Sequence, residues 1–248
     1  MRKVKYFVLI SVILGGLVFL FGPEVLPENQ QFYDFLHSAP KDDVIIIFNS
    51  GGWGNTPFEK AKDFAPIVEE TQKTLNEWGY NSVVIPYTRT KDSFLGEIAG
   101  AKEMFQLFPN QAEKLSKEIN EFLIKNPGKK IVIAGLSNGA VFVNETTKRI
   151  SQDVKNQIYA VEIGSPFWEE SSNFENTLRL DNGKKDPLAA GEMKTLIPNL
   201  FKASFRWVLA KISGRDLTFS KALQLPGHEY FWPEIESDVV SFLGDKLR

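Results

Sequence analysis

Short apolar runs alternate with segments of helical periodicity along most of the chain. Residues 44–48 read VIIIF, an unbroken run that is typical of a strand buried on both faces. Similar runs predict strands at 81–87, 130–136, 158–164 and 177–183. Strands that are separated by helices form parallel βαβ units. The pattern therefore predicts an α/β domain with a mostly parallel sheet and helices on both of its faces.

Between these runs, apolar residues recur at the spacing of one helix face. Such segments predict helices at about 64–78, 94–108, 110–125, 139–150, 192–212 and 233–247. Asn110 and Glu113 have the spacing of an N-cap and its reciprocal partner at the start of the third helix. Four aliphatic residues occupy every fourth position of the last helix: Ile235, Val239, Leu243 and Leu247.

The first 43 residues differ from the rest. Residues 1–5 form a basic flank, and residues 6–22 contain no charged side chain. A helix over 6–22 would be roughly 25 Å long, close to the hydrocarbon thickness of a bilayer. We expect a membrane anchor that leaves the flank in the cytoplasm and the domain outside, with a cleaved signal peptide or a buried apolar helix as alternatives. Residues 23–43 contain three prolines and are predicted to link this segment to a domain at 44–248.

Composition narrows the range of functions. The chain has 248 residues and a net charge of -2, which suits one globular α/β domain and argues against a nucleic-acid partner. It has no cysteine, so disulfides and thiolate nucleophiles are excluded, and only two histidines, His37 and His228. We find no phosphate-binding glycine motif and no histidine–carboxylate metal pattern, so no cofactor and no metal are expected.

Ser137 lies in the sequence GLSNG at 135–139, between a predicted strand and a predicted helix. A G-x-S-x-G turn in this context exposes a nucleophilic serine, and its glycines leave room for the tight turn. The backbone N–H of Asn138, at the helix N-terminus, would then point toward a developing oxyanion. The alternative is a serine that only packs in a strand–helix turn.

With this strand, GLSNG turn and helix, the chain resembles the α/β-hydrolase family over roughly residues 42–248. In that family the catalytic serine is followed by an acid after a late strand and by a histidine before the last helix. The resemblance implies that Ser137 is the nucleophile, His228 the base and Asp186 the acid that orients the histidine. Asp181, at the end of the same strand, is the alternative acid, and His228 could instead serve as a capping or core histidine.

The resemblance also implies a second oxyanion donor in the loop after the first strand. Family members often carry His-Gly there, whereas this chain reads FNSGGWG at 48–54. A backbone N–H of Gly51, Gly52 or Trp53 is the expected donor, and an ordinary glycine turn is the alternative. The sequence GSPF at 164–167 either lines the acyl side of the pocket or forms a turn.

The segment after Asp186 allows three interpretations. Apolar residues form a stripe along it: Leu200, Phe201, Phe205, Val208, Leu209 and Ile212. An ordinary surface helix would turn this stripe toward the core. In α/β-hydrolases, insertions around this point, here about 190–227, form caps over the pocket. A basic, amphipathic helix of this kind could also contact anionic lipid.

These observations predict a serine hydrolase that is anchored by residues 6–22 and acts on an ester or related acyl substrate outside the cytoplasm. Carboxylesterase or lipase activity is favoured over thioesterase, amidase or peptidase activity by the resemblance. Secretion after signal cleavage is the alternative location. A non-catalytic α/β-hydrolase-fold protein that serves as a binding or scaffold module at the membrane is the alternative function.

Overall fold

A computed structural model of the protein describes residues 27–38, 41–182, 185–215, 217, 222, 225 and 227–248. The predicted basic flank and the anchor at 6–22 lie outside these residues, as does part of the predicted cap region. Among the helices that the described residues form, none has the length and apolarity needed to cross a bilayer.

The core of the domain is a five-stranded parallel sheet with the order β2-β1-β3-β4-β5. Its strands are β1 (Val44–Asn49), β2 (Ser82–Pro86), β3 (Lys130–Leu136), β4 (Ile158–Ile163) and β5 (Thr177–Leu180). The register pairs Asn49 with Gly135 and Leu136 with Ile163, so the central strands end at the same level. We call this side of the sheet the carboxyl edge and the opposite side the amino edge. The predicted parallel α/β architecture is confirmed.

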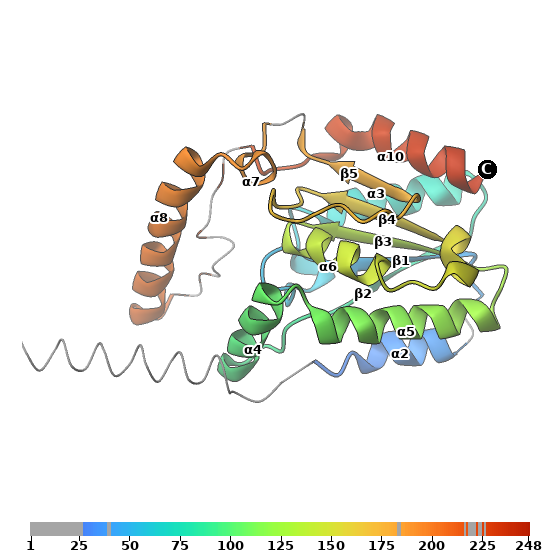
Figure 1. Ribbon diagram of the computed structural model, residues 1–248, viewed down its shortest axis with the longest axis horizontal. Helices are drawn as coiled ribbons and strands as arrows, with labels where there is room; N and C mark the ends of the chain where they lie inside the picture. Colours follow the sequence, from blue (N-terminus) through green and yellow to red (C-terminus); the bar gives the residue numbers. More distant parts are fainter. Residues whose placement is uncertain are drawn as a thin grey trace, which may run out of the picture.

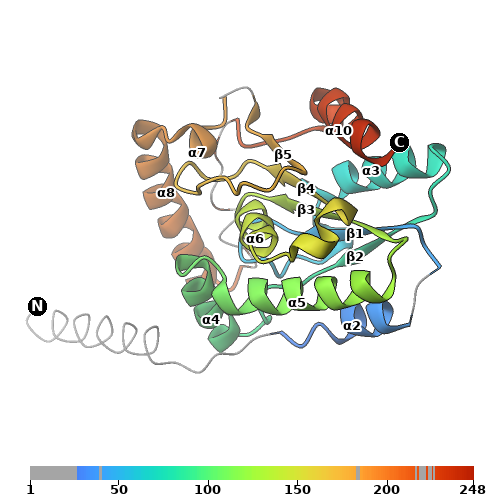
Figure 2. The same ribbon diagram turned by 45° about the vertical axis from the view of Figure 1, so that its right-hand side comes forward.

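Helices cover both faces of the sheet. They are α2 (Gln30–His37), α3 (Ala65–Glu77), α4 (Phe94–Phe105), α5 (Pro109–Lys125), α6 (Asn138–Thr147), α7 (Pro187–Ala190), α8 (Met193–Ile212) and α10 (Trp232–Leu247), with 3-10 turns at Phe58–Lys60 and Gln152–Gln157. Helices α3 and α10 cover one face, and α5 and α6 cover the other, with α2 packed outside α5 (Figures 1 and 2). Helices α4, α7 and α8 lie together at the carboxyl edge, on the left of Figure 1, whereas the C-terminus lies at the amino edge.

Alternation of side chains along each strand builds two separate cores. All six residues of β1 are buried. Ile45 and Ile47 belong to the cluster under α5 and α6, whereas Val44 and Ile46 belong to the cluster under α3 and α10. Each fully buried aliphatic side chain contributes about 1.5–3 kcal/mol to folding, so this two-sided burial makes β1 a rigid base for the loop that follows it.

Two local predictions differ from the structure. The segment expected as a linker contains α2, in which Phe32 and Leu36 are buried in the core cluster that includes α5 residues, so the folded domain begins before residue 30. Phe32 and Leu36, one helical turn apart and both buried, favour a helix here despite the flanking prolines. Asn110 is not an N-cap: α5 begins at Pro109, and the Asn110 amide donates to the Glu103 carboxylate at 2.9 Å.

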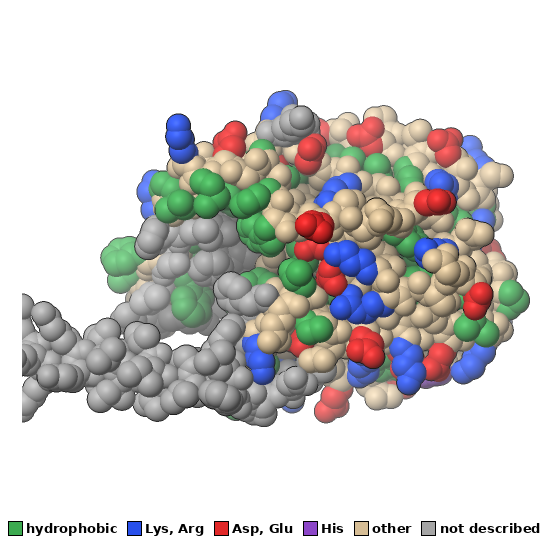
Figure 3. Space-filling view, in the orientation of Figure 1, with side chains coloured by type: hydrophobic (Ala, Val, Ile, Leu, Met, Phe, Trp, Pro, Cys, Tyr) green, Lys and Arg blue, Asp and Glu red, His purple; other side chains and the backbone are tan. Residues whose placement is uncertain are grey.

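Helix α8 leaves two residues of its apolar stripe, Phe205 and Leu209, exposed. Among the side chains of α8 that the structure describes, Leu196, Ala203 and Ala210 are buried, whereas Phe205 and Leu209 are 67% and 45% exposed. Apolar side chains gather on the surface over α7 and α8 (Figure 3). The inward orientation expected for an ordinary surface helix is therefore wrong for Phe205 and Leu209, which lie on the side of the helix away from the buried Leu196, Ala203 and Ala210.

Candidate active site

Ser137 occupies a one-residue turn between β3, which ends at Leu136, and α6, which begins at Asn138. Its φ of 55° and ψ of -118° are unusual for a residue with a side chain, a conformation that costs about 1–3 kcal/mol. The flanking glycines make the turn feasible, since a Cβ on Gly135 would lie 2.3 Å from the carbonyl oxygen of Gly139. The predicted strand–serine–helix geometry is confirmed, and Ser137 is half-buried rather than enclosed.

Asp186 and His228 form a direct pair. The His228 Nδ1 atom lies 2.7 Å from Oδ2 of Asp186, which is fully buried. Although burial raises the pKa of Asp186, the hydrogen bonds from His228, Tyr230 and the Leu188 backbone N–H hold it below its ordinary value. Oδ1 also accepts from the N–H of Leu188 at 2.8 Å and of Ala189 at 3.3 Å, which caps α7. The carboxylate therefore stays charged and oriented at neutral pH.

The structure places Asp186, and not Asp181, against His228. Asp181 is exposed at the end of β5. Asn182 has a φ of 54° and its side chain donates to the carbonyl of Gly227 at 3.1 Å, joining the acid loop to the histidine loop. This contact keeps the two loops in register while Asp181 points to solvent.

Tyr230 is a second hydrogen-bond donor to Asp186 that sequence reasoning missed. Its hydroxyl donates to Oδ2 at 2.6 Å, and burial together with this bond raises the pKa of Tyr230. It lies two residues after His228, so both side chains point to the same side of an extended segment. That spacing is the signal that could have identified it.

The backbone brings Ser137 and His228 to the same part of the carboxyl edge. The Ser137 N–H donates to the carbonyl of Ile163 at 2.8 Å. The next residue, Gly164, packs against the His228 ring, because a Cβ there would lie 2.9 Å from Cε1. No hydrogen bond joins the Ser137 hydroxyl to His228 among the described residues; in enzymes without substrate such bonds are often long and shorten when substrate binds.

The glycine loop after β1 lies against the serine turn. A Cβ on Gly139 would lie 2.4 Å from the Asn49 carbonyl, so only glycine allows this approach. The Asn138 side chain donates to the carbonyl of Gly52 at 3.3 Å, and Gly51 accepts from the N–H of Gly54 at 3.1 Å. The structure thus brings the predicted loop next to Asn138, while the choice of Gly51, Gly52 or Trp53 as donor stays a prediction.

Arg89 links this loop to the serine helix, and sequence reasoning missed it. The side chain is buried, and its guanidinium donates to the carbonyls of Ser50 and of Asn138, the latter at 3.2 Å. It also lies 5.0 Å and 5.8 Å from the ring centres of Phe108 and Phe142. Burial lowers the pKa of Arg89 to about 9, with no carboxylate of the described residues to offset it. A lone arginine three residues after a strand was the available signal.

Glu162 is a buried acid beneath the site. It lies on β4 opposite Gly135, and its Oε2 is 3.4 Å from Nε of Arg179. Neither of its carboxylate oxygens has a hydrogen bond within the described structure. Burial raises the pKa of Glu162 to about 7, while Arg179 acts in the opposite direction.

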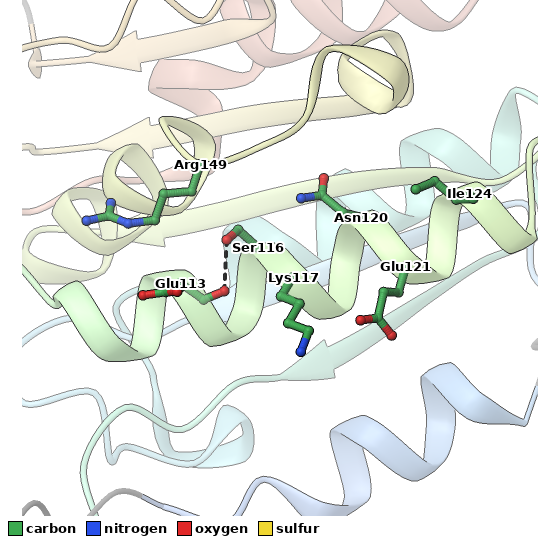
Figure 4. Close-up of a pocket in the computed structure, with 7 residues that line it drawn as sticks. All are labelled: Glu113, Ser116, Lys117, Asn120, Glu121, Ile124 and Arg149. Carbon is green, nitrogen blue, oxygen red and sulfur yellow. Dashed lines mark hydrogen bonds between the residues drawn. The ribbon is translucent and has the colours of Figure 1, made fainter.

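A shallow pocket lies elsewhere, on the outer side of α5 (Figure 4). Its lining residues are Glu113, Ser116, Lys117, Asn120, Glu121, Ile124 and Arg149. Arg149 follows the end of α6 that is remote from Ser137, and the Ser116 hydroxyl is bonded to the carbonyl of Glu113 at 2.9 Å. The described residues show no cluster of three or more acidic or histidine side chains around a common point here or elsewhere. This pocket is separate from the candidate active site.

Comparison with known proteins finds similar structures but no similar sequence family. No family model and no curated protein matches the sequence. A Trichoderma reesei cutinase in complex with a C11Y4 phosphonate inhibitor has a TM-score of 0.54 and 14% identity, over 96% of this chain and 98% of that chain. An acetylxylan esterase has a TM-score of 0.49 and 13% identity, over 82% and 98%. The likeness to the cutinase, taken with the parallel sheet and the serine turn, shows that this chain has the α/β-hydrolase fold.

Proposed function

We propose that this protein is a serine hydrolase in which Ser137 is the nucleophile, His228 the general base and Asp186 the residue that orients His228. The observation that carries the proposal is the position of the His228 ring. It lies between the buried Asp186 carboxylate and Gly164, directly beside the residue whose carbonyl binds the Ser137 N–H.

The chemistry follows from this arrangement. The Ser137 oxygen attacks the acyl carbon, and its proton moves to Nε2 of His228, while Nδ1–H stays bonded to Asp186. Collapse of the tetrahedral intermediate breaks the bond to the alcohol, which leaves with the proton from His228. Water then attacks the acyl-enzyme by the same route and releases the acid and free Ser137.

The oxyanion would be bound by backbone N–H groups. As the first residue of α6, Asn138 has an N–H without an acceptor inside the helix, at the positive end of the helix dipole. A second N–H would come from Gly51, Gly52 or Trp53. Arg89 supports this pair of donors. Its guanidinium binds the carbonyls of both Ser50 and Asn138 and so fixes the position of the glycine loop relative to the start of α6.

An ester is the substrate class that we propose, of the kind cleaved by carboxylesterases and lipases. The fold shared with an esterase that binds a phosphonate inhibitor supports this class. Thioesters and amides differ from esters mainly in the leaving group, so a panel of p-nitrophenyl esters, thioesters and peptides would rank the three. We further propose that residues 6–22 hold the domain at 44–248, with α2, on the outer side of the membrane.

The direct test is labelling with a fluorophosphonate probe, which reacts with an activated serine. We expect the wild-type protein to be labelled, Ser137→Ala to show no labelling, and Ser165→Ala, which removes a nearby buried hydroxyl, to retain it. Labelling of Ser137→Ala at the wild-type level would disprove the nucleophile assignment. A folded wild-type protein that is neither labelled nor active on any ester would favour the scaffold alternative.

A further inference from the structure

The exposed apolar side chains of this domain are concentrated at one edge. In the described part of the chain ten large apolar side chains are exposed. Nine lie on segments that leave the carboxyl ends of strands: Leu95, Leu107, Phe167, Trp168, Met193, Ile197, Phe205, Leu209 and Phe231. The tenth, Ile124, lies at the end of α5 on the amino edge. Chance scatter of surface side chains would not give this separation.

Helix α8 supplies four of the nine. Met193 and Ile197 are one turn apart, as are Phe205 and Leu209, and all four are at least 45% exposed. Leu196, Ala203 and Ala210 bury the opposite side of the helix. Exposed apolar side chains that gather on one face mark a candidate interaction site.

The Phe167–Trp168 pair continues the same surface. The two rings pack edge-to-face with centres 5.1 Å apart and are 46% and 54% exposed. Gly191, just before α8, packs on the Phe167 ring, since a Cβ there would lie 2.9 Å from it. Trp168 has an aromatic ring with a polar N–H, a type that is favoured where hydrocarbon meets water. We call α8 with Phe167 and Trp168 the apolar surface.

The charged side chains of α8 itself are all cationic, whereas two exposed acids, Glu170 and Glu192, flank the apolar surface. Helix α8 contains no aspartate or glutamate, and its Lys194 and Lys202 are exposed. Arg206 is also exposed, with its guanidinium donating to the carbonyl of Ala222 at 3.4 Å. A helix with an apolar face and basic neighbours is typical of proteins that bind anionic lipid at the interface.

The chain enters the domain at the same edge. Asn29 exchanges two hydrogen bonds with Thr88, which follows the carboxyl end of β2, at 2.8 and 3.0 Å. Asn29 lies seven positions after the end of the predicted anchor, and even a fully extended chain of that length spans only about 25 Å. An anchor at 6–22 therefore holds the carboxyl edge, and not the amino edge, near the bilayer.

We propose that the apolar surface docks on a lipid bilayer that contains anionic lipid, so that the candidate active site opens toward the membrane. Met193, Ile197, Phe205 and Leu209 enter the boundary between headgroups and acyl chains, and Lys194 and Lys202 lie against lipid phosphates. This inference concerns the surface and holds for the domain whether or not Ser137 is a nucleophile.

The absence of cysteine allows a site-specific test on the full chain. Phe205→Cys and Ile124→Cys are a matched pair, since the two side chains are 67% and 60% exposed on opposite edges. Each variant is labelled with an environment-sensitive dye and reconstituted into vesicles of phosphatidylcholine with phosphatidylglycerol, with and without brominated acyl chains. Because the apolar face of an interfacial helix lies about 5–10 Å into this boundary, we expect roughly half of the emission at position 205 to be quenched and little at position 124.

Three results would overturn the proposal. Quenching that is equal at the two positions would show that the apolar surface has no preference for lipid. Energy transfer between dyes at position 205 that rises with protein density, without bromolipid quenching, would identify a second copy as the occupant. Undiminished quenching in the double variant Lys194→Glu with Lys202→Glu, or in vesicles without phosphatidylglycerol, would show that docking does not need anionic lipid. Ester turnover is not measured, so failure here is distinct from failure of the proposed hydrolase function.

Discussion

The two edges of the sheet are formed by the same strands but use their polar groups differently. At the amino edge, the Tyr80 hydroxyl and the Lys130 ammonium both donate to the carbonyl of Leu247, and Arg248 lies 4.2 Å from the Trp78 ring centre. These contacts attach the end of α10 to β3 and to the turn after α3. Their effect is to hold the C-terminal end of the chain against the folded domain.

At the carboxyl edge, several groups are held in unfavourable conformations or environments. Ser137 has a positive φ, Arg89 is a buried cation, and the Ser165 hydroxyl has no hydrogen bond within the described structure. Ligands of open α/β sheets bind at the carboxyl ends of the strands, and strain is usually retained where it serves function. The comparison indicates that stability is provided by the amino edge and the two cores, and that the carboxyl edge is specialised for chemistry.

The largest expected effect is on the acid of the site. Asp186→Asn keeps the shape of the side chain but cannot stabilise the charged form of His228, so we expect kcat/KM on a p-nitrophenyl ester to fall by on the order of 10³–10⁴-fold. Asp181→Asn is the matched control and should retain wild-type activity, since Asp181 is exposed. A larger loss in Asp181→Asn than in Asp186→Asn would reverse the assignment.

Arg89 tests whether the carboxyl edge depends on a buried cation. Arg89→Met removes the donor that joins Ser50 to Asn138, and a displaced oxyanion loop should lower kcat/KM by on the order of 10²-fold. The buried Ser50 carbonyl, which loses its partner, should also cost about 1–3 kcal/mol in the free energy of unfolding. Arg149→Met, which removes an ion pair to Glu145 on the other end of α6, is the control. Equal activity in the two variants would contradict a role for Arg89 in positioning the loop.

The buried Glu162 should make the free energy of unfolding depend on pH. Because burial raises its pKa to about 7 from an ordinary 4.5, the folded state holds this proton more tightly than the unfolded state. Its contribution to stability is therefore complete below pH 4.5 and is lost as the pH rises to 7. Glu162→Gln should remove this dependence, so between pH 4 and pH 8 its free energy of unfolding should rise relative to that of the wild type by about 3 kcal/mol, measured by denaturant unfolding.

Glu145 is the control for that experiment, because its pKa shift has the opposite sign. Burial raises the pKa of Glu145, but Arg149 and Lys148 bring it below the ordinary value. Its contribution to stability is present at neutral pH and is lost as the pH falls through the lowered pKa. Glu145→Gln should therefore lower the free energy of unfolding most at pH 7. The same sign for both variants would contradict the assignment of Glu162 as a buried, destabilised acid.

The smallest expected effect is at the amino edge. Tyr80→Phe removes one hydrogen bond to the carbonyl of Leu247, which keeps its bond from Lys130 at 3.1 Å. We expect a loss of about 1 kcal/mol in the free energy of unfolding and no change in ester turnover. A substantial loss of activity would contradict the inference that the amino edge serves stability and the carboxyl edge serves chemistry.

Much of the fold could be predicted because its signals are local and strong. The run VIIIF is typical of a strand buried on both faces, and all five predicted strands were found within three residues of their predicted ends. The turn at Ser137 was predictable for the same reason, since two glycines around a serine between a strand and a helix leave few alternative conformations.

Other features depend on neighbours that are distant in the sequence. Whether Asn110 caps a helix or bonds to Glu103 is decided by the path of α4, and whether residues 30–37 fold is decided by the surface of α5. The outward orientation of Phe205 could not be predicted from α8 itself. An apolar stripe indicates that some apolar partner exists, but it does not say whether that partner is the core, a pocket or a bilayer.

By itself, the sequence determined the alternation of strands and helices, the serine turn, and the chain order of Ser137, Asp186 and His228, because each depends on covalent spacing and side-chain periodicity. Tertiary structure alone decided that Asp186 rather than Asp181 meets His228 and that Arg89 joins the two loops of the site. It also decided that exposed apolar side chains gather at the carboxyl edge. These outcomes depend on which segments pack together in three dimensions, and hydrogen bonds and burial across such distances leave no periodic signal in the chain.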